Sequence, residues 1–307
     1  MLSSGYRYLV VACGVLLAVS LGCGRGADAT HGKKGEPEAA AEKSIRVTGS
    51  DTMVNVAQAW AEEYMKKHPN VNIDVRGGGS GVGIASLIDG KCDLADASRK
   101  MTDSEIQKAK AKRGADPKEL IVGYDALAIY VPKDNPLDSI SIDELAEIYG
   151  KDGKITKWSE VGVKAPTLAD QPITRVSRQS SSGTYAYFRE VVVGEHRDYK
   201  LGSIDQSGSK DVVALVARTP SAIGYSGMGY KTPDVKMLKV SKHRGEPGVA
   251  PTVENARNNS YPITRPLQIY IVGEPAGAVK DYINWILSPG GQKVVLDLGY
   301  VPLNRHE

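Results

Sequence analysis

The sequence predicts an α/β protein with two lobes that are joined by two long strands. Segments with the period of a strand alternate with segments with the period of an amphipathic helix along most of the chain. Three consecutive strands each end in a polar turn that leads into a helix, which is typical of the carboxyl edge of an open α/β sheet. Two mostly apolar runs, 120–131 and 266–272, are long for single strands and predict two crossings between the lobes. We therefore expect a ligand cleft between the lobes.

The first part of the folded chain supplies three strand–turn–helix units. Met53, Trp60 and Tyr64 lie at helical spacing, so they mark a first helix that ends near His68. The glycine-rich loop 76–83 leads into the second helix. The expected strands are 45–47, 71–75 and 92–95, and the two further helices are 84–89 and 103–112.

The remainder of the chain alternates in the same way. Trp158 is expected in a loop, and a helix-like run begins at Tyr185. The other expected helices are 142–149, 211–216, 278–287 and 290–298, and the other expected strands are 173–177 and 222–226. The two crossings then predict a discontinuous lobe 1 at 44–126 plus 266–307, with lobe 2 inserted at 127–265.

The first residues predict a targeting segment. Arg7 is followed by an apolar run at 9–21 that is too short to span a membrane, so we interpret 1–22 as a signal peptide. The run closes on V-S-L-G-C, which resembles a bacterial lipobox with Cys23 as the lipidated residue. A plain secretory signal with an incidental cysteine is the alternative. Residues 23–43 are rich in Gly, Ala, Lys and Glu, and they predict a flexible tether.

Cysteine usage agrees with this interpretation. Cys13 would leave with the signal peptide and Cys23 would carry lipid, which leaves Cys92 as the single thiol. No disulfide can then form within the mature chain. We expect Cys92 to be buried and inert.

The most informative stretch is R-Q-S-S-S-G-T, which runs from Arg178 to Thr184 and leads into a helix. A guanidinium, several hydroxyls and the free amides of a helix N-terminus together suit an oxyanion. An ordinary N-cap turn is the alternative. The polar turns after the three strands of the first part of the chain offer matching groups: Ser50, Asp51 and Thr52; Ser80; Ser98 and Arg99.

Composition and motifs argue against several other functions. The net charge of +3 is too small to indicate nucleic acid or a membrane surface as a partner. The residues around Ser80 read G-G-S-G-V, which lacks the last glycine of a nucleophile elbow, and no S-x-x-K, P-loop or H-E-x-x-H spacing occurs at the candidate positions. We therefore expect no catalysis, no cofactor and no metal, although a serine-dependent phosphoester hydrolase stays a distant alternative.

Several blocks together resemble the periplasmic phosphate-binding proteins of bacterial phosphate ABC importers, the PstS family, and most closely its shorter, lipoprotein-like branch. The resemblance covers 45–303. Its blocks are G-S-D-T-M, R-G-G-G-S-G-V-G, D-L-A-D-A-S-R, R-Q-S-S-S-G-T-Y-A-Y-F, A-I-G-Y-S, Y-P-I-T-R-P-L and W-I-L-S-P-G-G-Q-K-V-V-L-D-L-G-Y-V-P-L. It implies a type II periplasmic-binding-protein fold, with two hinge strands and one dehydrated phosphate held between the lobes.

The resemblance also implies which residues bind phosphate. Carried over by position, they are Thr52, Met53 through its amide, Ser80, Ser98, Arg178, Ser182, Gly183 and Thr184. Ser50 is a further candidate, with the N-cap of the first helix as its alternative role.

Two positions depart from the family pattern. The longer branch has an aspartate after the residue that matches Ser98, and that carboxylate accepts a proton that phosphate has and sulfate lacks. Here the position is Arg99, so we expect Asp125 to supply the acceptor, with Asp51 as a second candidate and an Asp125–Arg99 ion pair as the alternative. Ser180 stands where many relatives have an acid that steadies the arginine.

The sequence thus predicts a monomer that binds hydrogen phosphate and delivers it to the permease of an ABC importer. Lipidated Cys23 would hold it at a membrane, in the periplasm or at the cell surface. The alternatives are a binding protein for sulfate, tungstate or molybdate, and a phosphate-linked sensor.

Overall fold

The computed structural model describes residues 43–194 and 196–303. The predicted signal peptide and Cys23 lie outside these residues, as does all of the predicted tether except Lys43. All the described residues belong to one compact unit, 41–307. The first strand begins at Lys43, two residues before the predicted start and on the last residue of the predicted tether.

A single sheet carries most of the strands, in the order β2-β1-β3-β11-β4-β8-β6-β7, with β9 also paired to β4. We call the elements around β1, β2 and β3 lobe 1 and those around β6, β7 and β8 lobe 2. The sheet strands are β1(Lys43–Gly49), β2(Val71–Arg76), β3(Leu94–Ala97), β4(Pro117–Pro132), β6(Thr174–Arg178), β7(Ile204–Gln206), β8(Ala222–Gly227), β9(Val235–Met237) and β11(Thr264–Val272). A separate two-stranded sheet consists of β5(Ser139–Ser141) and β10(Lys239–Ser241).

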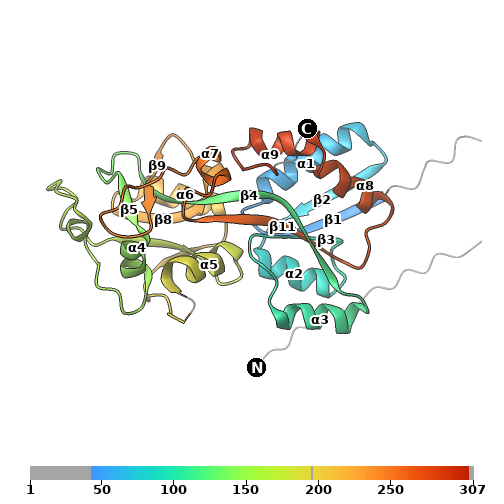
Figure 1. The fold of residues 1–307 in the computed structure, drawn as a ribbon, viewed down its shortest axis with the longest axis horizontal. Coiled ribbons are helices and arrows are strands. Elements are labelled where there is room, and N and C mark those ends of the chain that lie inside the picture. Colours follow the sequence, from blue (N-terminus) through green and yellow to red (C-terminus); the bar gives the residue numbers. More distant parts are fainter. Residues whose placement is uncertain (1–42, 195, 304–307) are drawn as a thin grey trace, which may run out of the picture. The chain divides into compact units, whose positions relative to one another are not determined.

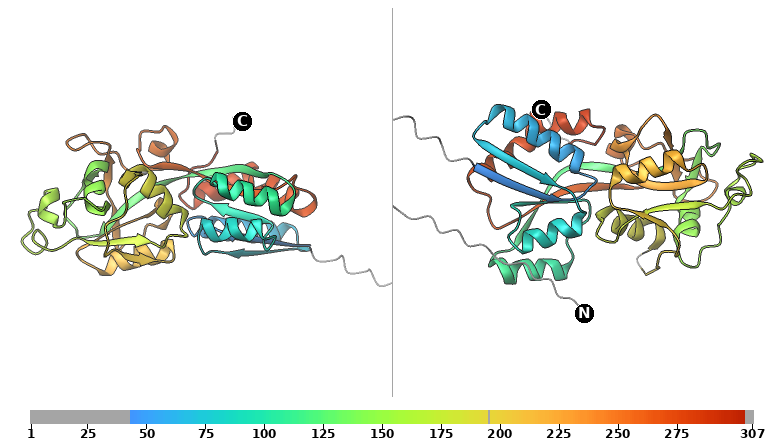
Figure 2. Two further views of the ribbon diagram at one scale, coloured as in Figure 1. Left: turned by 90° about the horizontal axis from the view of Figure 1, so that it is seen from below. Right: turned by 180° about the vertical axis from the view of Figure 1, so that it is seen from behind.

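Two long antiparallel strands, β4 and β11, run side by side between the lobes (Figures 1 and 2). The first part of β4 pairs with β11, and its last residues pair with β8 and β9 of lobe 2. β11 in turn pairs with β3 of lobe 1. The predicted lobe boundaries after 126 and before 266 fall inside these two strands.

In lobe 1, helices cover both faces of the sheet. Figure 1 shows α2 and α3 on one face and α1, α8 and α9 on the other. These helices are α1(Val54–Lys67), α2(Ser80–Ile88), α3(Asp103–Arg113), α8(Gly277–Ile286) and α9(Pro289–Asp297). Trp60 of α1 donates its indole N–H to the carbonyl of Gly291 in α9 at 2.8 Å, so the C-terminal helices are tied to the first one.

In lobe 2, α6 packs against β8 and β6, while α4 packs on the helical segment that continues α5. The buried Tyr149 of α4 donates its hydroxyl to the carbonyls of Val176 in β6 and Ile223 in β8. The helices are α4(Ile142–Tyr149), the 3-10 helix η1(Trp158–Val161), α5(Gly183–Phe188), the π-helix η2(Arg189–Gly194), α6(Ser209–Arg218), the 3-10 helix η3(Met228–Tyr230) and α7(Val253–Arg257).

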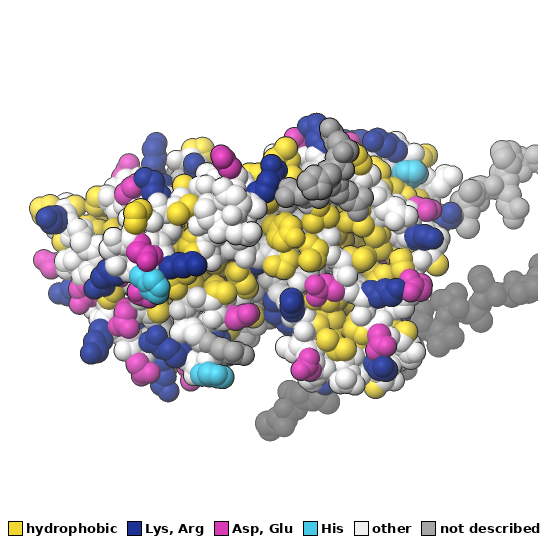
Figure 3. Space-filling model, viewed as in Figure 1, with side chains coloured by type: hydrophobic (Ala, Val, Ile, Leu, Met, Phe, Trp, Pro, Cys, Tyr) yellow, Lys and Arg dark blue, Asp and Glu magenta, His cyan; other side chains and the backbone are white. Residues whose placement is uncertain are grey.

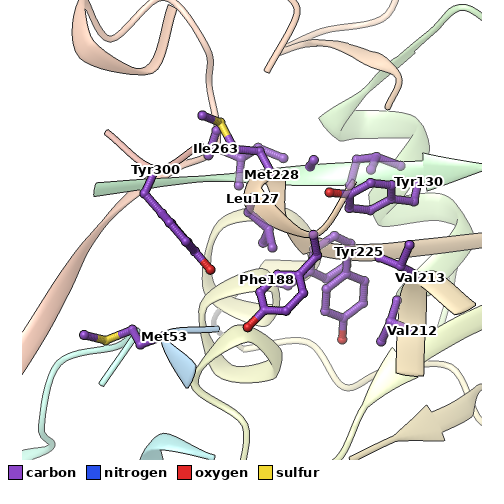
Figure 4. Packing of buried hydrophobic residues seen from close by; sticks show 14 of the residues in the cluster. Met53, Leu127, Tyr130, Phe188, Val212, Val213, Tyr225, Met228, Ile263 and Tyr300 are labelled. Carbon is purple, nitrogen blue, oxygen red and sulfur yellow. The ribbon is translucent and has the colours of Figure 1, made fainter. Parts of the chain in front are cut away.

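The main hydrophobic core is continuous through β4 and β11. Figure 4 shows side chains from both lobes in this cluster, among them Met53, Leu127 and Phe188. Phe188 stacks on Tyr225 with ring centroids 3.8 Å apart. A second cluster lies under α2 and α3 and includes Cys92.

Several predicted elements differ from the structure. The glycine loop was expected to reach Ile84, but α2 already begins at Ser80, because Gly79 turns the chain with a φ of 98° and the next residues continue as helix. The expected strand 92–95 is wrong by two residues, since pairing with β1 starts only at Leu94. Trp158 begins a 3-10 helix instead of lying in a loop. The expected helix 142–149 is confirmed, with a capping box between Ser141 and Glu144.

The prediction that Cys92 is a buried thiol is confirmed, because its side chain is 2% exposed and lies under α2. Burial raises the pKa of this thiol to about 12, so it stays protonated and unreactive near neutral pH. Among residues 43–194 and 196–303, no helix is long and apolar enough to cross a membrane. On the face shown in Figure 3, basic and acidic side chains are interspersed.

Candidate functional site

Three of the hydroxyls predicted at the strand ends of lobe 1 are linked through Ser98. Ser50 Oγ donates to Ser98 Oγ at 2.9 Å, and Ser98 N–H donates to Ser80 Oγ at 3.0 Å. All three are at most 2% exposed. They meet because β1 and β3 are parallel neighbours, so the turns after them and the start of α2 gather at one edge.

The turn after β1 also positions Thr52 and Met53. The hydroxyl of Tyr300 donates to the carbonyl of Thr52 at 2.6 Å, so the C-terminal segment braces this turn. The alternative role of Ser50 as the N-cap of α1 is wrong, since Met53 occupies that position and the Ser50 hydroxyl is bonded to Ser98. The amide of Met53 donates to the carbonyl of Ser50 at 2.9 Å.

The hydroxyl-rich turn of lobe 2 lies directly against lobe 1. Ser182 caps α5, its Oγ accepting from the amides of Thr184 and Tyr185, and Thr184 Oγ1 lies 2.7 Å from Thr52 Oγ1. Gly183 has no room for a side chain. A Cβ at this position would stand 2.3 Å from Ser80 Oγ. The two halves of the predicted site are therefore adjacent.

Arg178 ends β6 and is fully buried, and its hydrogen bonds go to groups outside the hydroxyl cluster. Its Nη1 donates to Ser209 Oγ at 3.0 Å and its Nε to the carbonyl of Gln206 at 3.3 Å. Its Nη2 donates to the carbonyl of Ser207 and to Asp51 Oδ2, both at 2.8 Å. Burial lowers the pKa of the guanidinium, and the charge of Asp51 opposes that effect.

A second buried arginine, Arg265 of β11, lies among the hydroxyls, and sequence reasoning missed it. Its Nη2 donates to Thr52 Oγ1 at 3.1 Å and to Thr184 Oγ1 at 3.0 Å. Its Nη1 donates to the carbonyl of Ser98 at 3.3 Å. The block Y-P-I-T-R-P-L contains this residue, but a cation inside a strand carried no local sign of a site.

Asp125 of β4 is the ion-pair partner of Arg265, at 2.9 Å from Nη2. Its other oxygen, Oδ1, accepts from the amide of Met228 at 3.2 Å. Burial raises the pKa of Asp125, and Arg265 opposes that effect. The alternative ion pair between Asp125 and Arg99 is wrong. Arg99 instead pairs with Glu105 at 2.7 Å.

The site is rich in hydroxyls and guanidiniums, which can donate hydrogen bonds to an oxyanion. Six buried hydroxyls from both lobes lie close together, and each of the two neighbouring carboxylates already faces a guanidinium. Among the described residues, no group of three His, Cys, Asp or Glu side chains could hold a metal ion. Ser182 Oγ accepts from two backbone amides and has no histidine among its partners.

Comparison with known proteins identifies the family. A model described as the PBP superfamily domain matches residues 34–289. The phosphate-binding protein PstS of Pseudomonas aeruginosa is 36% identical over 270 residues, which covers 85% of this chain and 83% of the relative. The chain belongs to the PstS family. PstS of Bacillus subtilis is 31% identical and aligns with 96% of the chain and 92% of its own length.

Solved structures of PstS-like proteins agree with this assignment. A phosphate-bound putative phosphate ABC transporter substrate-binding protein from Clostridium perfringens is 31% identical, with a TM-score of 0.76 over 85% of this chain and 100% of that one. A phosphate transport receptor from Vibrio cholerae is 28% identical, with a TM-score of 0.65 over 84% of this chain and 100% of that one. The predicted type II periplasmic-binding-protein fold of this PstS-family chain is confirmed.

Proposed function

We propose that this protein binds inorganic phosphate between its lobes and delivers it to the permease of an ABC importer. The observation that carries the proposal is the cluster of buried hydroxyls contributed by both lobes, with two buried guanidiniums at its border, in a PstS-family chain. The named relatives are phosphate-binding proteins and a phosphate-bound transporter component, which supports phosphate as the ligand. Hydrogen bonds to a charged group contribute roughly 1.5–3 kcal/mol each, so several together offset the loss of hydration.

We assign the anion contacts to both lobes and to the strands between them. Arg265 is added to the sequence-based set because its Nη2 already touches Thr52 and Thr184. The proposed ligand residues are Ser50, Thr52, Met53, Ser80, Ser98, Asp125, Arg178, Ser182, Gly183, Thr184 and Arg265. The lobes are assigned to 44–126 plus 266–307 and to 127–265.

Calorimetry with phosphate at neutral pH tests this function directly. We expect the full chain to bind phosphate tightly. In Arg178→Ala we expect the phosphate affinity to fall by more than about tenfold, or 1.4 kcal/mol. A wild-type protein that does not bind phosphate would contradict the function. Unchanged affinity in Arg178→Ala would contradict only the assignment of this arginine.

A different oxyanion is a second candidate, and one observation favours testing it. Asp125 Oδ2 already accepts two hydrogen bonds from Arg265, and Oδ1 accepts one from the amide of Met228, so only Oδ1 has a lone pair left for the proton of hydrogen phosphate. We propose that Asp125 accepts the proton of hydrogen phosphate. We therefore predict that Asp125→Asn narrows the preference for phosphate over sulfate. Competition calorimetry with phosphate, sulfate, tungstate and molybdate measures that preference. If Asp125→Asn prefers phosphate over sulfate as strongly as the wild type does, Asp125 is not the acceptor.

The membrane attachment of the protein rests on Cys23. We propose that the mature chain begins at a lipidated Cys23 and acts as a monomer in the periplasm or at the cell surface. Mass spectrometry of the protein from membranes of the producing cell would detect the acyl groups. Cys23→Ala is expected to release the protein into the soluble fraction. No catalytic activity is proposed.

A further inference from the structure

The most specific feature outside the hydroxyl cluster is the contact between Asp51 of lobe 1 and Arg178 of lobe 2. Asp51 Oδ2 accepts from Arg178 Nη2 at 2.8 Å, while the arginine side chain is fully buried and the aspartate side chain is 15% exposed. The other carboxylate oxygen, Oδ1, accepts from the amide of Gly78 at 2.9 Å. One carboxylate therefore joins the glycine loop of lobe 1 to the arginine of lobe 2.

Among residues 127–194 and 196–265 of lobe 2, no carboxylate pairs with this arginine. The partners of Arg178 within lobe 2 are the carbonyls of Gln206 and Ser207 and the hydroxyl of Ser209, all of them uncharged. Ser180, two residues after the arginine, is exposed and carries no charge. The negative charge that compensates the buried guanidinium thus comes from the opposite lobe.

The contacts around Asp51 belong to a wider set of contacts between the lobes, which we call the seam. Tyr230 of lobe 2 donates its hydroxyl to the carbonyl of Asp51 at 2.5 Å. On the other side of the glycine loop, the amide of Gly81 donates to the carbonyl of Ser181 at 3.0 Å. A cavity of about 230 Å³ borders the seam and is lined by Asp51, by residues of α1 and by the start of α6. Separation of the lobes would break these contacts together and would leave Arg178 buried without a carboxylate.

We propose that Asp51 is a positioning residue that couples closure of the lobes to the orientation of Arg178. This inference rests on the proposed function in taking Arg178 as part of the phosphate site. A buried charge without its partner is costly, so the ion pair favours the arrangement in which the lobes meet. The same pair holds the guanidinium against Asp51, which directly precedes Thr52 in lobe 1, and Asp51 itself need not touch the anion.

The test compares Asp51→Asn with Asp51→Glu and with Asp74→Asn as the matched control. Asp74 is an exposed aspartate in β2 that pairs with Arg76, so its variant removes the same charge away from the seam. Phosphate affinity is measured by calorimetry on the full chain. Asp51→Asn is expected to lose about tenfold or more in affinity, Asp51→Glu to lose less, and Asp74→Asn to match the wild type.

A second measurement follows the seam without any ligand. Hydrogen exchange of the Gly81 amide reports separation of the lobes, because its acceptor lies on lobe 2. The Ser98 amide is the internal control, since its acceptor, Ser80 Oγ, lies within lobe 1. We expect faster exchange at Gly81 and unchanged exchange at Ser98 in Asp51→Asn.

The outcomes separate this inference from the proposed function. A wild-type protein that does not bind phosphate contradicts the function, whereas the exchange of Gly81 still tests the coupling between the lobes. If phosphate binds and Asp51→Asn changes neither affinity nor exchange, the inference is overturned. Weaker binding with unchanged exchange at Gly81 also overturns it, because Asp51 would then act without affecting closure.

Discussion

Two arginine–carboxylate pairs among the described residues have a buried arginine, and they lie in different regions of the chain. Asp125 and Arg265 lie on the adjacent strands β4 and β11, and their side chains are 0% and 1% exposed. Asp51 and Arg178 lie on opposite lobes, and the aspartate keeps 15% exposure. The first pair is held in place by a continuous strand pairing. The second exists only while the lobes are in contact.

This difference suggests different roles for two chemically similar pairs. A pair fixed between paired strands cannot separate without unfolding, so it keeps the Arg265 guanidinium at the border of the site, and loss of either partner destabilises the fold. A pair across two lobes can separate while each lobe stays folded, so it responds to ligand and to closure. Substitutions at the two pairs should therefore affect different measurements.

The largest effect is expected for Arg265→Met. The change leaves the Asp125 carboxyl buried without its cation, which typically costs about 3 to 5 kcal/mol. Urea unfolding would measure it as a lower transition midpoint. The double variant Arg265→Met with Asp125→Asn should recover part of the loss, since no buried charge is then left unpaired. A single variant as stable as the wild type would show that the strand-bound pair contributes nothing to stability.

Another buried acid, Asp96, extends the comparison because no cation among the described residues forms a salt bridge with it. It is 3% exposed, its Oδ1 has no hydrogen-bond partner, and burial raises its pKa to about 7. The unfolded chain has an ordinary carboxyl pKa near 4, so the folded protein binds the extra proton between pH 4 and pH 7. The free energy of unfolding therefore falls as the pH rises through that window, by roughly 4 kcal/mol at most.

Asp96→Asn should remove this pH dependence. The neutral amide resembles the protonated acid, so we expect a higher melting temperature than the wild type at pH 8 and a similar one at pH 4.5. Asp93→Asn is the control, because Asp93 is paired with Arg46. Burial by itself would raise the pKa of Asp93, but the hydrogen bonds and charge of Arg46 outweigh it, and the pKa is lowered. Asp93→Asn should therefore show no gain in melting temperature at high pH. If Asp96→Asn raises the melting temperature equally at both pH values, the Asp96 carboxyl does not titrate in this range.

A smaller effect is expected for Gly183→Ala, which tests how closely the lobes meet. The added methyl group would stand 2.3 Å from Ser80 Oγ and 2.7 Å from Ser98 Oγ, so these hydroxyls must rotate out of their hydrogen bonds or the lobes must move apart. We predict a loss of about tenfold in phosphate affinity, or 1.4 kcal/mol, with little change in the stability of either lobe. Ser180→Ala is the control on the exposed side of the same turn. Affinity equal to the wild type in Gly183→Ala would contradict the close approach of the lobes.

Local pattern predicted much of the fold and three of the four residues of the two pairs, but not the pairing itself. The spacing of Met53, Trp60 and Tyr64 predicted α1, and the length of the run 120–131 predicted a strand that continues from one lobe toward the other. Arg178 was found because hydroxyls and a glycine follow it within a few residues. The short strands β5, β7, β9 and β10 were not predicted, because runs of three residues carry too little periodicity.

Arg265 could not be found in the same way. Its partner Asp125 is 140 positions away, and its neighbours in T-R-P-L are those of an ordinary strand. Only the pairing of β4 with β11 places Arg265 opposite Asp125 and beside the two threonines. The role of Asp51 was equally hidden, since it depends on a contact with a residue on the other lobe.

The sequence by itself determined the α/β class, the polar turns at the strand ends and the chemistry of the hydroxyl-rich stretch, because these depend on neighbours within a few residues. The tertiary structure alone decided which carboxylate meets which arginine. Buried charges must be paired, and the partner is selected by sheet register for Arg265 and by the contact of two lobes for Arg178. Neither selection leaves a trace in the local order of residues.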